Sequence, residues 1–162
     1  EGTSLARYGA NMLPLEPQSP FGRTSPIFSY PYARSREALA HLAAHAPLDP
    51  GHGAVLRYVN PLTGGHAMPT IGTQLQLLPA GFATATTRTT AGRVFSVVEG
   101  DAEVTIAPSG GADAVTYRVG PKDHFVVPPW AALSLSAGTE CVLFSFSDAP
   151  LQEAAGILRT RS

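Results

Sequence analysis

The stretch Val94-Phe-Ser-Val-Val-Glu-Gly-Asp-Ala-Glu-Val-Thr-Ile-Ala107 decides the fold class. Its two ends are short apolar segments rich in β-branched residues, and the turn formers Glu99-Gly-Asp101 stand between them. Apolar residues recurring with a period of two are typical of a half-buried strand, and Gly with Asp between two such runs favours a tight turn. The stretch therefore predicts strands over 94–98 and 102–107, joined by a hairpin at 99–101.

The same pattern recurs on both sides, from Ala54 onward, about every ten residues. Gly, Pro, Asp and Ser separate the segments, and Ser109-Gly-Gly111 predicts a second hairpin turn. The further predicted strands are 72–78, 82–88, 114–119, 124–127, 132–136 and 140–146. Short strands at such regular spacing indicate a mainly all-β protein, an antiparallel sandwich or barrel.

Helices are expected on either side of the strands. Residues 35–45 have a helical apolar period, with Ser35 as N-cap, Glu37 in the first turn and Pro47 ending the helix. A second helix is predicted after Asp148, with Pro150 in its first turn and Arg159 and Arg161 at its C-terminal end. The apolar stripes would be Leu39, Leu42, Ala43 and Ala46 in the first helix and Leu151, Ala154, Ala155 and Leu158 in the second.

An extended arm precedes the first helix. Its prolines, which disfavour a helix over residues 9–33, are Pro14, Pro17, Pro20, Pro26 and Pro31. Its aromatic residues, which favour an arm lying on the rest of the protein, are Phe21, Phe28, Tyr30 and Tyr32. The sequence thus divides into an arm with a helix (1–53), a barrel (54–147) and a C-terminal helix (148–162).

Composition and charge exclude several classes of function. Of the 162 residues 44% are hydrophobic and only 14% charged, with a net charge of −1, which argues against disorder. Balanced charges with a single lysine, Lys122, argue against a nucleic-acid partner. No apolar stretch approaches the ~20 residues of a membrane helix, so no membrane contact is expected. The lone Cys141 predicts a buried thiol and a cytoplasmic location.

Residues 81–133 resemble the cupin barrels in the spacing of two metal-binding motifs. The first motif falls on Gly81, Thr87, Thr89, Arg93 and Gly100, and the second on Pro128, Trp130 and Leu133. Cupins have histidines and a glutamate where this chain has Thr87, Thr89, Arg93 and Leu133. A divalent transition metal needs about three to four imidazole, thiolate or carboxylate donors. We therefore predict no metal at these four vestigial positions and no catalytic residue in the chain.

The histidines do not replace the missing ligands. His41 and His45 are one helical turn apart, a spacing that some zinc sites use, but no third ligand is in register, so an exposed helix face is the expected role. His52 and His66 lie in glycine-rich segments and are expected to be polar loop residues. His124 opens a strand and could point into the barrel, where a single imidazole would not make a metal site.

Other polar groups are also expected to be non-catalytic. Glu99, Asp101 and Glu103 crowd one turn, where solvation would prevent the separation of pKa values that a catalytic carboxylate pair needs. Ser145 and Ser147 lack the glycines of a nucleophile elbow. Arg93, if it points into the barrel, could bind a carboxylate or pair with an internal acid, and a structural or mouth-facing role is favoured.

The chain also resembles gentisate 1,2-dioxygenases, specifically the C-terminal half of these two-cupin enzymes, and the related dioxygenases of salicylate and 1-hydroxy-2-naphthoate. The segments that carry the resemblance are Arg7-Tyr-Gly9, Tyr30-Pro-Tyr32, Tyr58-Val-Asn-Pro-Leu-Thr-Gly64, Thr73-Gln-Leu-Gln-Leu-Leu-Pro-Ala-Gly81, Val97-Val-Glu-Gly100, Phe125-Val-Val-Pro-Pro-Trp130 and Leu143-Phe-Ser-Phe-Ser-Asp-Ala-Pro150. The resemblance implies a cupin double-stranded β-helix, or jelly roll.

The resemblance further implies a parent enzyme that opens the ring of a hydroxylated aromatic acid with O2. Its Fe(II) would be held by three histidines of the N-terminal cupin, which would precede Glu1, and the family commonly forms tetramers. The chain itself would be catalytically inactive, and would pack on that N-terminal cupin and build the homo-oligomer. The absence of an initiator Met and of a signal peptide fits an internal piece of such a protein.

Two alternatives remain at the level of sequence. One is a stand-alone metal-free cupin that binds a small carboxylate through Arg93. The other is a scaffold cupin without any ligand.

Overall fold

The structure is a computed structural model that describes residues 7, 15, 24–27 and 29–162. The arm predicted over residues 9–33 therefore lies largely outside the described residues, as do Phe21 and Phe28. In the described part, no helix is long and apolar enough to cross a membrane.

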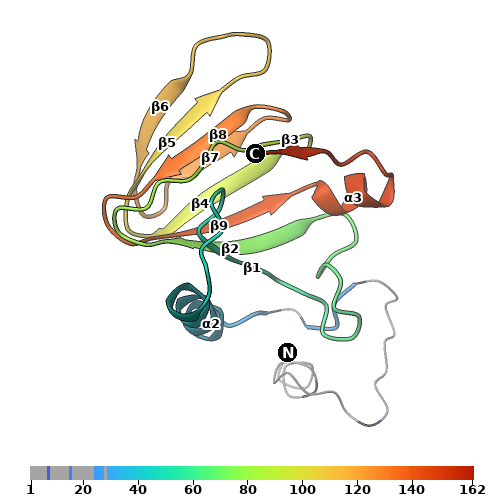
Figure 1. Ribbon diagram of the computed structural model, residues 1–162. Coiled ribbons are helices and arrows are strands. Elements are labelled where there is room, and N and C mark those ends of the chain that lie inside the picture. The colour runs from blue at the N-terminus through green and yellow to red at the C-terminus, as the bar shows by residue number, and fades with distance from the viewer. Residues whose placement is uncertain (1–6, 8–14, 16–23, 28) are drawn as a thin grey trace.

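Two antiparallel sheets face each other and enclose the core (Figure 1). The first has the strand order β1-β2-β9-β4-β7 and the second has the order β6-β5-β8. The strands of the first sheet are β1 (Ala54–Arg57), β2 (Gly72–Leu78), β9 (Cys141–Ser147), β4 (Arg93–Glu99) and β7 (His124–Val127). Those of the second are β6 (Val115–Val119), β5 (Ala102–Ala107) and β8 (Ala132–Ser136). The predicted β-barrel is confirmed. Apart from β1, for which no bounds were predicted, these bounds agree with the predicted strands to within a residue.

The predicted strand over 82–88 forms only in part. Ala83 and Thr87 make isolated bridges to Ser136 and Leu133 of β8. The regular strand is limited to β3 (Arg88–Thr89), which pairs with β10 (Thr160–Arg161) near the C-terminus. These contacts extend the second sheet along the edge of β8.

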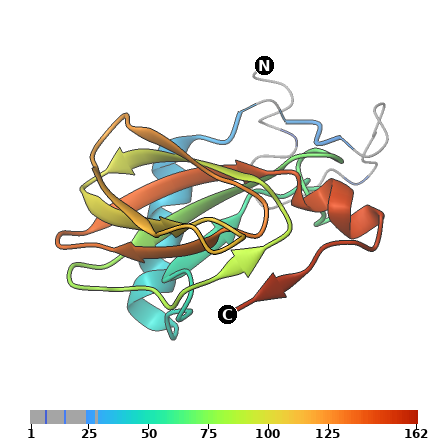
Figure 2. The ribbon, with the colours of Figure 1, turned by 90° about the horizontal axis from the view of Figure 1, so that it is seen from above.

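The outer face of the larger sheet is covered at one end by α2 (Tyr32–His45), as both ribbon views show (Figures 1 and 2). Leu39 of this helix is fully buried against Leu75 and Leu77 of β2 and Val142 of β9. Because side chains alternate along a strand, Leu75 and Leu77 of β2 face outward to the helix, and Gln74, Gln76 and Leu78 face the barrel interior. Because α2 packs on the outside of β2, the glutamines of this strand face the barrel interior, where apolar residues would be expected.

Both helices differ from their predicted bounds. The first begins at Tyr32 with Pro31 at the N-cap position, so Ser35 is not the cap and Glu37 is not in the first turn. Proline is favourable where a helix begins, since its fixed φ suits a turn that needs no N–H donor. The second helix, α3, is only Ala149–Ala154, and Gly156 at φ +70° follows it. Arg159 and Arg161 thus lie beyond the helix, Arg161 in β10.

The turn at Glu99–Asp101 is a corner between the two sheets and not a hairpin. It leads from β4 in the larger sheet to β5 in the smaller one. Gly100 has φ +70°, and a Cβ atom there would lie 1.9 Å from the carbonyl oxygen of Glu140. Glycine is required because the two turns cross in close contact. The turn at 109–111 is the predicted hairpin, since it joins β5 to the paired β6.

Candidate functional site

The interior of the barrel is apolar at one end and polar at the other. The apolar end includes Leu78, Val97, Val104, Cys141 and Leu143, all at most 2% exposed. Toward the other end, the inward positions of β2, β9 and β4 change to polar residues. Two cross-strand rows contain them, namely Gly72–Ser147–Arg93 and Gln74–Ser145–Phe95. Sequence reasoning placed only Arg93 in this group, because nothing in β2 or β9 alone shows which face the helix covers.

Arg93 is the cation of this polar end. It begins β4, two residues before the buried Phe95, and its guanidinium carbon lies 5.6 Å from the centre of the Phe95 ring. Its Nε and Nη2 atoms are buried and have no hydrogen-bond partner in the described structure. Burial lowers the pKa of Arg93 to about 10, because the charged form is desolvated, so the side chain is still protonated at neutral pH.

Two further template positions, Thr87 and Leu133, face each other across a bridge. Each backbone N–H of the pair donates to the carbonyl of the other at 2.9 Å. Directly opposite residues of an antiparallel pair point to the same face, and Leu133 belongs to the interior cluster, so Thr87 also faces the interior. Gln76 is likewise buried and donates to the carbonyl of His52 at 2.7 Å.

The fourth position, Thr89, lies beside the chain that connects β7 to β8. Its carbonyl accepts a hydrogen bond from the Trp130 N–H at 2.7 Å, and its hydroxyl accepts one from Ala91 N–H at 3.2 Å. Gly92, the neighbour of Arg93, is close to Pro129 in the same connection. The four positions therefore lie at one end of the barrel, although their common role stays a prediction.

These residues do not fit a divalent metal. Thr87 and Thr89 offer neutral hydroxyls, Leu133 offers no donor, and the Arg93 charge repels a cation. In the part of the chain that the structure describes, no three His, Cys, Asp or Glu side chains lie together as metal ligands would. The chemistry of this end is that of a hydrogen-bonding, positively charged lining.

The histidines are distributed over the surface of the fold. His41 and His45 stack on each other, with ring centres 5.8 Å apart, on the exposed side of α2. The ring of His52 bonds Asp49 at 2.8 Å, and that of His66 bonds Glu153 of α3 at 3.0 Å. His124 is exposed and pairs with Ser96. It is adjacent to Phe125 in β7, so the two side chains point to opposite faces of the sheet. It therefore points away from the barrel interior, where it had been a candidate.

Glu99 is partly exposed, as the sequence suggested for a turn residue, but it also connects the turn to α2. It accepts hydrogen bonds from the Tyr32 hydroxyl and, at 3.0 Å, from Nε of Arg36, which also pairs with Glu140. The Tyr32 hydrogen bond and the Arg36 charge hold the pKa of Glu99 below its ordinary value. Burial and the Glu99 carboxylate raise the pKa of Tyr32. Of the two acids that follow Glu99 in the sequence, Glu103 lies 3.7 Å from Arg118, and both side chains of that pair are exposed.

Cys141 is fully buried in the apolar end, as predicted. Desolvation, with the negative charge of Asp101, raises the pKa of its thiol to about 11. The thiolate that reactivity requires is therefore scarce at neutral pH.

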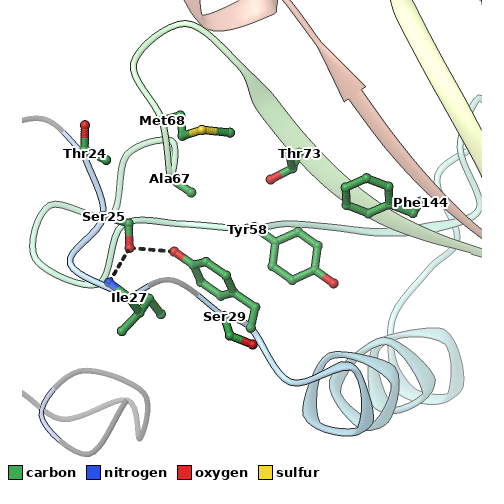
Figure 3. A pocket seen from close by; sticks show the side chains of 10 residues that line it. Thr24, Ser25, Ile27, Ser29, Tyr58, Ala67, Met68, Thr73 and Phe144 are labelled. Atoms are coloured by element: carbon green, nitrogen blue, oxygen red, sulfur yellow. Dashed lines mark hydrogen bonds between the residues drawn. The ribbon is translucent and has the colours of Figure 1, made fainter. Parts of the chain in front are cut away.

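A surface pocket of about 480 Å³ lies between residues 24, 25, 27, 29 and 30 and the outer face of β2 and β9 (Figure 3). Tyr58, Phe144 and Met68 are among its apolar lining residues. The Tyr30 hydroxyl donates to the carbonyl of Val59 at 2.7 Å and lies 2.8 Å from the Ser25 hydroxyl. Among the described residues that line it, none carries a carboxylate, an imidazole or a cationic group. The described lining suits an apolar group.

Two facing antiparallel sheets with a polar interior end define the chain as a cupin-type barrel. Over nearly its whole length it is similar in sequence to gentisate and salicylate dioxygenases. It is 48% identical over 158 residues to gentisate 1,2 dioxygenase 1 of Aquipseudomonas alcaligenes. It is 32% identical over 146 residues to 5-aminosalicylate 1,2-dioxygenase of a Comamonas species.

A solved structure agrees with this assignment. Salicylate 1,2-dioxygenase of Pseudaminobacter salicylatoxidans superimposes with a TM-score of 0.85 at 36% identity, over 98% of this chain and 45% of that protein. No family model matches the chain. The match covers 98% of the chain but only 44% of the Aquipseudomonas enzyme, so the chain spans less than half the length of its relatives.

Proposed function

We propose that the chain is the metal-free C-terminal cupin of an Fe(II)-dependent dioxygenase that opens the ring of a hydroxylated aromatic acid. The observation that supports this most directly is the combination of near-complete alignment to gentisate 1,2 dioxygenase 1 with Thr87, Thr89, Arg93 and Leu133 at the template positions. A barrel of this family without metal donors suits a supporting role. The iron and its three histidines would belong to the N-terminal cupin, outside this chain.

The supporting role would be to hold that second cupin and to build the oligomer. Phe146, Val94 and Val126 are cross-strand neighbours on the outer face of the larger sheet, beside the part that α2 covers. Phe146 is 42% and Val126 61% exposed. We call this row the open outer face. An exposed apolar row that continues a covered face is typical of a contact surface, and the greater length of the relatives offers a second cupin as the occupant.

The test is made on the intact protein. Iron content per polypeptide is measured together with oxygen uptake in the presence of gentisate, salicylate and 1-hydroxy-2-naphthoate. We expect about one iron per polypeptide and turnover of at least one of these acids. The double variant Thr87→Ala/Thr89→Ala should keep both the iron and the turnover. Loss of iron in that variant, or oxygen uptake with none of the acids, would contradict the proposal.

A further inference from the structure

We propose that the polar end of this barrel binds a small organic molecule through a carboxylate, with the Arg93 guanidinium as its anchor. The site would be separate from the proposed iron centre, because it is formed by residues of this chain alone. Its elements are the cation Arg93, the aromatic base Phe95, and the inward hydroxyls and amides of β2 and β9.

The first argument is that the Arg93 side chain is partly buried and that the buried part of its guanidinium has no partner. It forms no ion pair with any residue that the structure describes, and two of its three guanidinium nitrogens are buried without an acceptor. The contact with the Phe95 ring offsets only part of the desolvation of a cation. A buried charge that lacks a partner is strongly unfavourable. An anion that reaches the guanidinium would remove this penalty. Its binding free energy would therefore be more favourable than for an anion that pairs with a solvent-exposed arginine.

The second argument is that the surroundings suit a carboxylate. A planar guanidinium matches the two oxygens of a carboxylate in a bidentate pair. A guanidinium can also pair with phosphate, but phosphate carries more than one negative charge at neutral pH, and the cross-strand neighbours of Arg93 are the neutral Ser147 and Val127. Ser145 and Gln74, in the next row, can hydrogen-bond polar substituents.

The third argument concerns access and the apolar part of the ligand. Gln74 is exposed although it faces inward, so this end of the barrel reaches the surface. Phe95 and Phe125 stack with ring centres 4.8 Å apart beside Arg93, and Leu133 belongs to the same cluster. A carboxylate on Arg93 would thus have an apolar floor below it, which favours an organic acid over an inorganic anion.

The test uses the intact protein and three probes, namely benzoate, its neutral analogue benzamide, and inorganic phosphate. The variants are Arg93→Met, Arg93→Lys, and Arg118→Met as a control, which removes one positive charge from a side chain that is 82% exposed. Binding is followed by isothermal titration calorimetry and by the shift of Tm. A ligand that prefers the folded state must raise Tm, by about 5–10 °C at 100 times Kd for a protein of 150–250 residues and by less for a longer one.

We expect benzoate, but neither benzamide nor phosphate, to raise Tm in the wild type and in Arg118→Met. Arg93→Met should lose this shift. Arg93→Lys should bind benzoate at least about tenfold more weakly, because lysine keeps the charge but cannot form the bidentate pair of hydrogen bonds. Without ligand, Arg93→Met should unfold at the same temperature as the wild type or higher, since it removes an unpaired buried cation.

Three results would overturn the inference. One is a benzoate shift that is equal in Arg93→Met and Arg118→Met, or absent from the wild type at millimolar concentration. Another is a ligand-free Arg93→Met that unfolds well below the wild type, which would mean that a protein carboxylate already pairs with Arg93. The last, which remains decisive if Arg93→Met does not fold, is an unchanged affinity in Arg93→Lys. Iron content and oxygen uptake, which test the ring-cleaving role, are independent of all three.

Discussion

At one position of the cupin motif, the backbone has the conformation that suits the glycine of the motif, although the side chain is different. Trp130 stands where the second motif has a glycine, and it has the positive φ of 63° that a glycine would take without strain. The conformation is held on both sides, by the N–H of Trp130 donating to Thr89 and by Nη1 of Arg88 donating to the Trp130 carbonyl at 2.9 Å. Tertiary contacts therefore enforce a turn that the residue itself disfavours.

Substitutions at Trp130 should separate backbone strain from ring packing. Trp130→Ala and Trp130→Gly both remove the ring, which is 37% exposed, but only glycine relieves the strain of positive φ. We expect Trp130→Gly to be the more stable of the two by about 1 kcal/mol, measured by urea unfolding. Equal stability of the two variants, or a more stable alanine variant, would contradict strain at this position.

At the scale of elements, the strands were largely predictable and the helices less so. The strands 102–107, 124–127 and 132–136 were predicted with the bounds that the structure has, because period-two patterning and turn residues are local signals. The helix ends depend on Pro31, after which the first helix begins three residues earlier than predicted, and on Gly156, before which the second helix ends although its apolar pattern continues. The corner at Gly100 could not be distinguished from a hairpin, since both need the same turn residues.

The candidate site could be predicted from the sequence only at positions that belong to the two cupin motifs. The template placed Arg93, but the inward amides and serines of β2 and β9 were missed. Gln74 and Gln76 alternate with leucines in a pattern that would normally put the amides in solvent. Only the packing of Leu39 against Leu75 and Leu77 shows that the polar face of β2 is the inner one. No local signal in the sequence contains that information.

The tether between α2 and the barrel should make stability depend on pH. The pKa of Glu99 is lower in the folded protein than in the unfolded chain, so its contribution is present above the unfolded value near 4.5 and is lost as the pH falls through the folded value. Glu99 is 42% exposed, and screening limits its contribution to about 1 kcal/mol or less. Glu99→Gln should therefore be less stable than the wild type at pH 7.

The difference in Tm between the wild type and Glu99→Gln should shrink as the pH is lowered from 7 to 3. Glu37→Gln, an exposed residue of the same helix, is the matched control and should show little change at any pH. A difference that stays constant over this range would show that the Glu99 charge does not hold the helix.

At the scale of the whole molecule, the larger sheet has an outer face that is covered at one end and open at the other. The helix α2 covers Leu75, Leu77 and Val142, whereas Phe146 and Val126 remain exposed. If the proposed second cupin packs on the open outer face, these side chains are buried in the intact protein. A charge introduced there would then be desolvated without a partner.

Val126→Glu should therefore destabilise the intact protein by about 2 kcal/mol or more, seen as a lower Tm and as faster amide exchange along β7. Thr116→Glu, at an exposed position of β6 in the smaller sheet, is the control and should stay within about 0.5 kcal/mol of the wild type. If both variants unfold at the same temperature as the wild type, the open outer face is not the contact surface.

The division of the barrel interior into an apolar and a polar end has an evolutionary consequence. The packed core around Val104, Cys141 and Leu143 extends to Phe95 and Val127 beside Arg93, whereas two nitrogens of Arg93 itself have no partner. Substitution of Arg93 itself should thus carry a smaller thermodynamic risk than substitution of its apolar neighbours. A lineage that gives up metal ligands in such a scaffold keeps a stable framework in which a different specificity can be selected.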